Sequence, residues 1–95
     1  MKPIDFQPIE KEAIPNLHFS NTEMLTDPEA IKLRTERLNR ACQLGNAHKG
    51  KVLIQFISEE GGFEVNTTVW NCSDDRIVLK QGLHLPVSAI VSVSL

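Results

Sequence analysis

The fold is decided by residues 52–67, which read VLIQFISEEGGFEVNT. Every second side chain from Val52 to Phe56 is large and apolar, which is the period of a strand that buries one face. Residues 59–62, EEGG, interrupt this run with a composition typical of a turn, and a second alternating run occupies residues 63–70. The stretch therefore predicts a β-hairpin.

Further short strands are expected after the hairpin. Residues 71–75 form a polar turn, and the apolar runs 77–80, 83–85 and 89–95 follow it. Residues 86–88, PVS, favour a single 3₁₀ turn before the last run. The pattern predicts five strands in all.

A helix is expected before the hairpin. Residues 26–29, TDPE, combine a capping Thr26 or Asp27 with a proline suited to the first turn and a glutamate placed as in a capping box. Apolar residues then recur at helical spacing, and Gly45 follows them as a candidate C-cap. The signals predict an amphipathic helix over about 28–44.

Residues 1–26 differ in character from the rest of the chain. They contain three prolines and no sustained hydrophobic period, which predicts an irregular N-terminal arm. The apolar side chains within residues 14–19 favour docking of this arm onto the strands. Residues 27–95 are expected to form a single domain.

These elements predict an α+β fold, in which the helix packs on a five-stranded antiparallel SH3-like or Sm-like barrel over about 51–95. A helix followed by five short strands, with a very tight turn between the last two, resembles the layout of such small barrels. The resemblance covers about residues 27–95. Within this class the chain is similar to the bacterial Sm-like RNA chaperones (Hfq) in its Asp-Pro helix start, its basic helix and residues 52–56, 77–80 and 89–93.

The layout also resembles the Rho-binding antiterminator family, whose role is to bind a protein partner. The site motifs of the RNA chaperones do not carry over, because residues 85–87 are Leu-Pro-Val where those chaperones have Tyr-Lys-His. Their uridine-binding chemistry is therefore not implied. A similar fold without the site residues is only an analogy for function.

Composition and motifs restrict the function classes. The 95 residues carry a net charge of -2 and no apolar run long enough to cross a bilayer, and the N-terminal sequence lacks the pattern of a secretory signal. Two cysteines make no disulfide framework, so a cytoplasmic protein is expected. No catalytic motif, metal-ligand spacing or cofactor motif occurs. We therefore expect no enzyme activity, no metal, no cofactor, no membrane contact and no small-molecule substrate.

Positive charge is concentrated in residues 28–56, which hold six Lys/Arg and two Glu. Three arginines recur every three residues on the predicted helix, and two lysines follow it. Such a stripe favours RNA binding as one alternative, because phosphates can neutralise it; a solvated helix face is the other. The residues of this candidate stripe are Arg34, Arg37, Arg40, Lys49 and Lys51.

Trp70 is the only tryptophan, and it either closes the core beneath the helix or forms part of a partner surface. Residues 81–95 lack charged side chains, although edge strands normally carry charge. The last strand is therefore expected to be covered by the helix or by residues 1–26, or to pair with another subunit. The leading prediction is a small cytoplasmic binding or assembly module that contacts a protein partner, or a second copy, through a barrel edge and Trp70. Sm-like RNA binding is the alternative.

Overall fold

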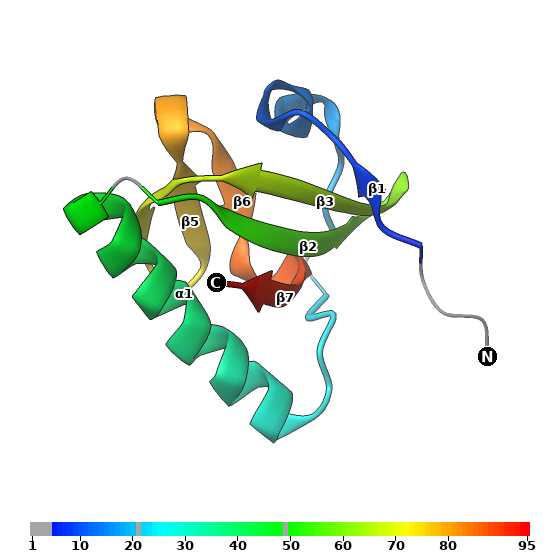
Figure 1. Ribbon diagram of the computed structural model, residues 1–95. Helices are drawn as coiled ribbons and strands as arrows, with labels where there is room; N and C mark the ends of the chain where they lie inside the picture. Colours follow the sequence, from blue (N-terminus) through cyan, green and yellow to red (C-terminus); the bar gives the residue numbers. More distant parts are fainter. Residues whose placement is uncertain (1–4, 21, 49) are drawn as a thin grey trace.

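The computed structural model describes residues 5–20, 22–48 and 50–95, with the side chain of residue 48 excepted. This part of the chain has one long α-helix and two small sheets (Figure 1). In chain order the elements are β1 (Gln7–Pro8), η1 (Lys11–Asn16), α1 (Pro28–His48), β2 (Val52–Ser58), β3 (Gly61–Thr67), β4 (Val69–Cys72), β5 (Arg76–Leu79), η2 (Lys80–Gly82), β6 (His84–Pro86), η3 (Val87–Ala89) and β7 (Ile90–Ser94).

The two sheets have different strand orders. The four-stranded sheet runs β1-β3-β2-β7, in which β2 pairs antiparallel with both β3 and β7, and β1 pairs parallel with β3. The three-stranded sheet is antiparallel and runs β4-β5-β6. The predicted hairpin is confirmed, since β2 and β3 pair from Val52 opposite Thr67 to Ser58 opposite Gly61. The 3₁₀ turn expected near Pro86 is also confirmed as η3.

The predicted five-stranded barrel is wrong, because the strands form two small sheets and not one closed barrel. The run 63–70, predicted as one strand, divides at Thr68 between β3 and β4, which belong to different sheets. Thr67, Thr68 and Val69 are all buried in succession. Because a regular strand turns successive side chains to opposite faces, three buried neighbours mark the break between the two strands.

The helix begins as predicted and ends later than predicted. Asp27 is the capping residue, since its Oδ1 accepts a hydrogen bond from the Glu29 amide at 3.1 Å. The helix extends through Gly45 to His48, so the end predicted at 44 is wrong. Gly45 is buried and serves a packing role instead: a Cβ there would lie 2.1 Å from the Val69 carbonyl oxygen. The missing side chain lets the helix touch β4.

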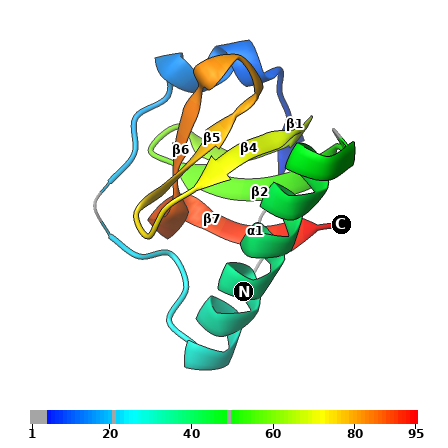
Figure 2. The ribbon, with the colours of Figure 1, turned by 90° about the vertical axis from the view of Figure 1, so that its left-hand side faces the viewer.

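Helix α1 lies against both sheets, beside β4 and β7 (Figure 2). Its buried positions are Arg34, Leu38, Ala41 and Gly45, which recur every three or four residues and so form one face. The helix therefore covers the last strand, β7, which was one of the three alternatives predicted for that strand. No helix in the described ranges combines the length and apolar character needed to cross a membrane.

The N-terminal segment packs onto the rest of the molecule. Ile14, within η1, is buried in the common core with residues of both sheets and the helix. The Phe19 ring lies 6.0 Å from the ring of Phe56 on β2, measured between centroids. The predicted docking of residues 14–19 onto the strands is thus confirmed. Residues 5–26 also contribute β1 to the larger sheet.

Candidate functional site

One groove on the described surface is lined by two of the candidate binding residues, Lys51 and Trp70. We call it the Trp70 groove. It has a volume of about 550 Å³ and lies where the C-terminal part of α1 meets the start of β2, β4 and η2. Its lining residues are Gly45, Asn46, Lys51, Thr68, Trp70 and Lys80.

Trp70 is an exposed residue of β4. Its neighbour Val69 is completely buried, whereas Trp70 is 47% exposed. Trp70 lies at the register shift between Val69 and Asn71 in the β4–β5 pair, and Asn71 is exposed as well. The Trp70 carbonyl oxygen accepts a long hydrogen bond from the Cys42 thiol, at 3.9 Å, which connects β4 to α1. The interpretation of Trp70 as a core residue is wrong, and the indole is available to a partner.

Two lysines give the groove its charge. Lys51 and Lys80 are exposed, and neither forms an ion pair with any residue that the structure describes. No acidic residue lines the groove. The Lys80 amide donates a 3.0 Å hydrogen bond to the Thr68 carbonyl, which holds η2 next to the end of β3. The groove therefore combines an exposed aromatic side chain with two positive charges, which attract anionic groups.

The side of the groove formed by the helix depends on Gly45. Because a Cβ at this position would overlap the Val69 carbonyl, only glycine lets α1 come this close to β4. The Asn46 amide donates to the Cys42 sulfur at 3.5 Å, so its side chain is oriented along the helix. The helical side of the groove is thus built on closely packed backbone.

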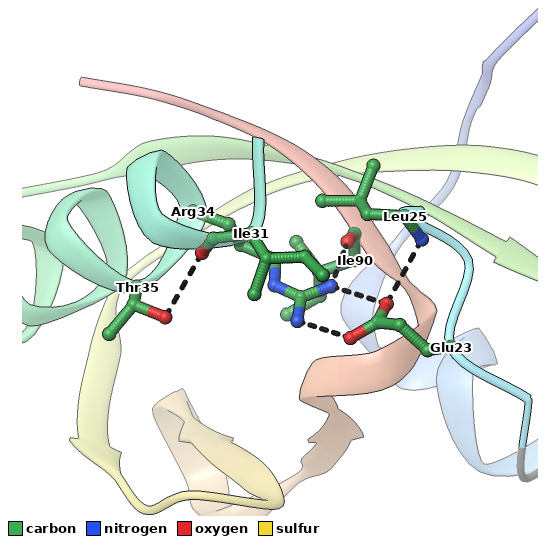
Figure 3. Close-up of polar contacts among 6 residues, drawn as sticks. All are labelled: Glu23, Leu25, Ile31, Arg34, Thr35 and Ile90. Atoms are coloured by element: carbon green, nitrogen blue, oxygen red, sulfur yellow. Dashed lines mark hydrogen bonds and ion pairs between the residues drawn. The ribbon is translucent and has the colours of Figure 1, made fainter. Parts of the chain in front are cut away.

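Arg34, the first residue of the predicted basic stripe, is not available to a ligand. It is only 5% exposed, and its Nη1 donates to Glu23 Oε2 at 2.7 Å and to the Ile90 carbonyl at 3.0 Å (Figure 3). Its Nη2 donates to the other oxygen of the same carboxylate. The Arg34 guanidinium holds the pKa of Glu23 below its ordinary value. Arg34 is a structural residue that joins α1 to β7 and to the N-terminal segment.

The other predicted stripe residues are dispersed. Arg37 donates from Nη1 to the Val93 carbonyl at 3.0 Å, so it lies on the β7 flank of the helix. Arg40 is exposed one turn further along α1, away from the groove lining. Lys49 lies outside the described residues. Of the candidate binding residues, the structure brings together Lys51 and Trp70.

Sequence reasoning missed Asn46 and Lys80. Lys80 reaches the groove because Val69 on β4 pairs with Leu79 on β5, which places the residue after β5 beside the start of β4. A hairpin between these strands was predictable, but its register was not. Without the register of the β4–β5 pair, Lys80 was interpreted only as the polar end of a short strand.

Cys72, two residues after Trp70, is a poor nucleophile. Cys42 and Cys72 are free thiols, and the Cys72 sulfur donates to the Leu38 carbonyl at 3.3 Å. Burial, together with the neighbouring Cys42, raises the pKa of Cys72 to about 12. Because the thiolate is the reactive form, this thiol is unreactive at neutral pH. Within the described residues, no three His, Cys, Asp or Glu side chains gather in a way that could hold a metal ion.

Comparisons with known proteins leave the groove as the main guide to function. No family model, no curated protein and no solved structure matches this chain. The resemblances to the Sm-like RNA chaperones and to the Rho-binding antiterminators therefore stay predictions.

Proposed function

We propose that this protein is a small non-catalytic binding module that contacts a protein partner through the Trp70 groove. The observation that carries the proposal is the half-exposed Trp70, which lines one groove together with two lysines that have no ion-pair partner among the described residues. Tryptophan is among the residues that contribute most to binding at protein interfaces, because a large apolar ring is buried together with a polar N–H.

The groove also defines the chemistry of its partner. Lys51 and Lys80 favour carboxylates, while the ring of Trp70 favours a bulky apolar side chain. We therefore propose a partner segment in which an apolar residue is flanked by acidic ones. The contact expected at a strand edge moves to this groove, because α1 covers β7 and the Arg37 side chain already bonds the Val93 carbonyl.

RNA binding has weaker support. Affinity for RNA grows with the number of phosphates that the protein neutralises. The proposed stripe loses Arg34 to the interior, and its exposed members Arg37 and Arg40 do not line the groove. Two lysines remain at the groove, on a chain whose net charge is -2.

The test uses Trp70 as its own reporter, since the chain has no other tryptophan. Emission of Trp70 is followed during titration with a short capped peptide in which one leucine is flanked by glutamates. The matched probes are the same peptide with lysines and a uridine oligonucleotide. We expect saturable binding of the acidic peptide and none of the basic one. A response to the oligonucleotide alone, steeply weakened by salt, would support RNA binding instead.

Variants connect the signal to the groove. The double variant Lys51→Glu/Lys80→Glu should weaken peptide binding at least about tenfold, because charge reversal replaces two attractions with repulsions. Arg76→Glu is the matched control, because Arg76 is exposed on β5 and does not line the groove. Equal binding by all three proteins would refute a role for the groove.

A further inference from the structure

A second exposed apolar residue lies on the N-terminal half of α1. Leu33 is 49% exposed and borders a shallow hollow of about 510 Å³. We call this surface the Leu33 patch, and its lining residues are Asp27, Glu29, Ala30, Lys32, Leu33 and Glu36. Three carboxylates and one ammonium line this hollow, so the hollow is negative. On its other side Leu33 borders the exposed Arg37 and the buried Arg34, whose charge is paired with Glu23.

The Leu33 patch has the chemistry that the Trp70 groove requires. The groove is lined by an exposed aromatic residue and two lysines, and the hollow of the patch is lined by an exposed leucine, three carboxylates and one lysine. Glu29 and Glu36 are exposed, and neither forms an ion pair among the described residues. Each surface therefore combines an exposed apolar side chain with charged ones, and the two hollows have charges of opposite sign.

The two surfaces cannot meet within one molecule. Both belong to the same rigid helix, and Asn46 at the groove follows Leu33 by thirteen residues. At 1.5 Å per residue these positions are roughly 20 Å apart along the axis. Contact between the patch and the groove therefore requires two copies.

We propose that the Trp70 groove of one copy binds the Leu33 patch of a second copy. This inference rests on the proposed function and identifies its partner as the chain itself. Because the two surfaces differ, one contact leaves a groove free on one copy and a patch free on the other. The complex then either closes reciprocally as a dimer or adds further copies. The small area and the charged side chains make the association dependent on concentration and weaker in high salt.

The first measurement is the molar mass of the full chain by light scattering after size exclusion, over a range of concentrations at low and high salt. We expect the mass to rise with concentration at low salt and to fall towards that of the monomer at high salt. Trp70→Ala and Leu33→Lys should each weaken association at least about tenfold, since each removes one half of the contact. Arg76→Glu should associate like the unmodified protein.

Mixing the two variants gives the decisive test. Trp70→Ala retains an intact Leu33 patch and carries no tryptophan, whereas Leu33→Lys retains an intact groove with its Trp70 reporter. Added together they should form a one-to-one complex, seen as a saturable change in Trp70 emission. The double variant Trp70→Ala/Leu33→Lys, which lacks the patch, should produce no change.

The outcomes separate this inference from the proposed function. If the mixture gives no signal while the groove still binds the acidic peptide, self-association is refuted and the binding function stands. If neither probe changes the emission, both fail. Association that survives in both single variants would also overturn the proposal. Circular dichroism of each variant, whose altered side chain is exposed in the native fold, checks that it remains folded.

Discussion

At the scale of single residues, Gly45 lets the helix pack directly against β4, because it has no side chain. We expect Gly45→Ala to destabilise the protein by about 1–3 kcal/mol, because an overlap with backbone cannot be relieved by a side-chain rotation. Helix propensity alone predicts the opposite sign, with alanine favoured by about 1 kcal/mol.

Urea denaturation followed by circular dichroism measures the effect of Gly45→Ala. Gly50→Ala is the control, because a Cβ at Gly50 would meet its nearest neighbour, Leu44, only at 3.9 Å. A Gly45→Ala variant as stable as the Gly50→Ala variant would show that α1 can move away from β4 without cost.

Glu23 makes the fold sensitive to acid. Because hydrogen bonding to Arg34 lowers its pKa below the ordinary 4.5, the stabilising effect of the carboxylate is complete above pH 4.5 and is lost as pH falls through the lowered value. We expect Glu23→Gln to cost about 1–3 kcal/mol at pH 7, nearer the lower figure because the carboxylate is partly exposed.

Unfolding free energies measured in urea between pH 3 and 7 test this prediction. The Glu23→Gln variant should show a flatter loss of stability in acid than the unmodified protein, and Glu36→Gln, at an exposed helical position, should behave like the latter. An unchanged acid dependence in Glu23→Gln would contradict the role given to the ion pair.

The burial of Arg34 could have been predicted from the sequence. Position 34 lies on the same helical face as Leu38 and Ala41, so the period that predicted the helix also pointed this arginine inward. The prediction placed it in an exposed stripe because Arg34, Arg37 and Arg40 recur every three residues. Arginine is seldom buried without a partner. Its partner, Glu23, lies in the segment expected to be irregular, and no local pattern connects the two.

At the scale of elements, the N-terminal segment is held to the β2–β3 turn by a titratable pair. His18 Nδ1 lies 2.6 Å from Glu60 Oε2, and the His18 amide donates to Glu60 Oε1 at 2.9 Å. Hydrogen bonding and charge from Glu60, with a smaller effect of Glu59, raise the pKa of His18 above its ordinary 6.5. The His18 amide and side chain lower the pKa of Glu60.

The docking of this segment should therefore depend on pH. The contribution of protonated His18 is complete below pH 6.5 and is lost as pH rises through its raised pKa, while that of Glu60 is lost in acid. We expect proteolysis within residues 5–20 to be faster at pH 9 than at pH 6. In His18→Gln this difference should disappear; a difference that persists would assign the effect to another group.

Elements whose sequence signals are local were predicted correctly, and features that depend on contacts between distant residues were missed. The hairpin, the helix start and the 3₁₀ turn each depend on residues close in sequence, and all three are confirmed. The division between β3 and β4 was missed because Thr67, Thr68 and Val69 suit a continuous strand equally well. The later helix end was missed because Gly45 resembles a C-cap in the sequence. In the structure Gly45 lies within the helix, where it allows close packing against β4.

At the scale of the whole molecule, the N-terminal segment contributes to the common core. Ile14 is nearly fully buried among residues of the helix and both sheets. Ile14→Ala should cost about 2–4 kcal/mol, because the lost contacts leave a cavity. Thermal unfolding measures the change, with Leu95→Ala, at an exposed position, as the control. Equal midpoints would mean that the core is complete without this segment.

The edge strand β7 has one further consequence for behaviour in concentrated solution. Its carbonyls at Ile90 and Val93 accept hydrogen bonds from arginine side chains of α1. A strand without charged side chains is thus blocked from templating fibril growth by guanidinium groups and not by its own composition. Loss of Arg37, which leaves the Arg34–Glu23 pair intact, should therefore raise the tendency of β7 to start fibrils.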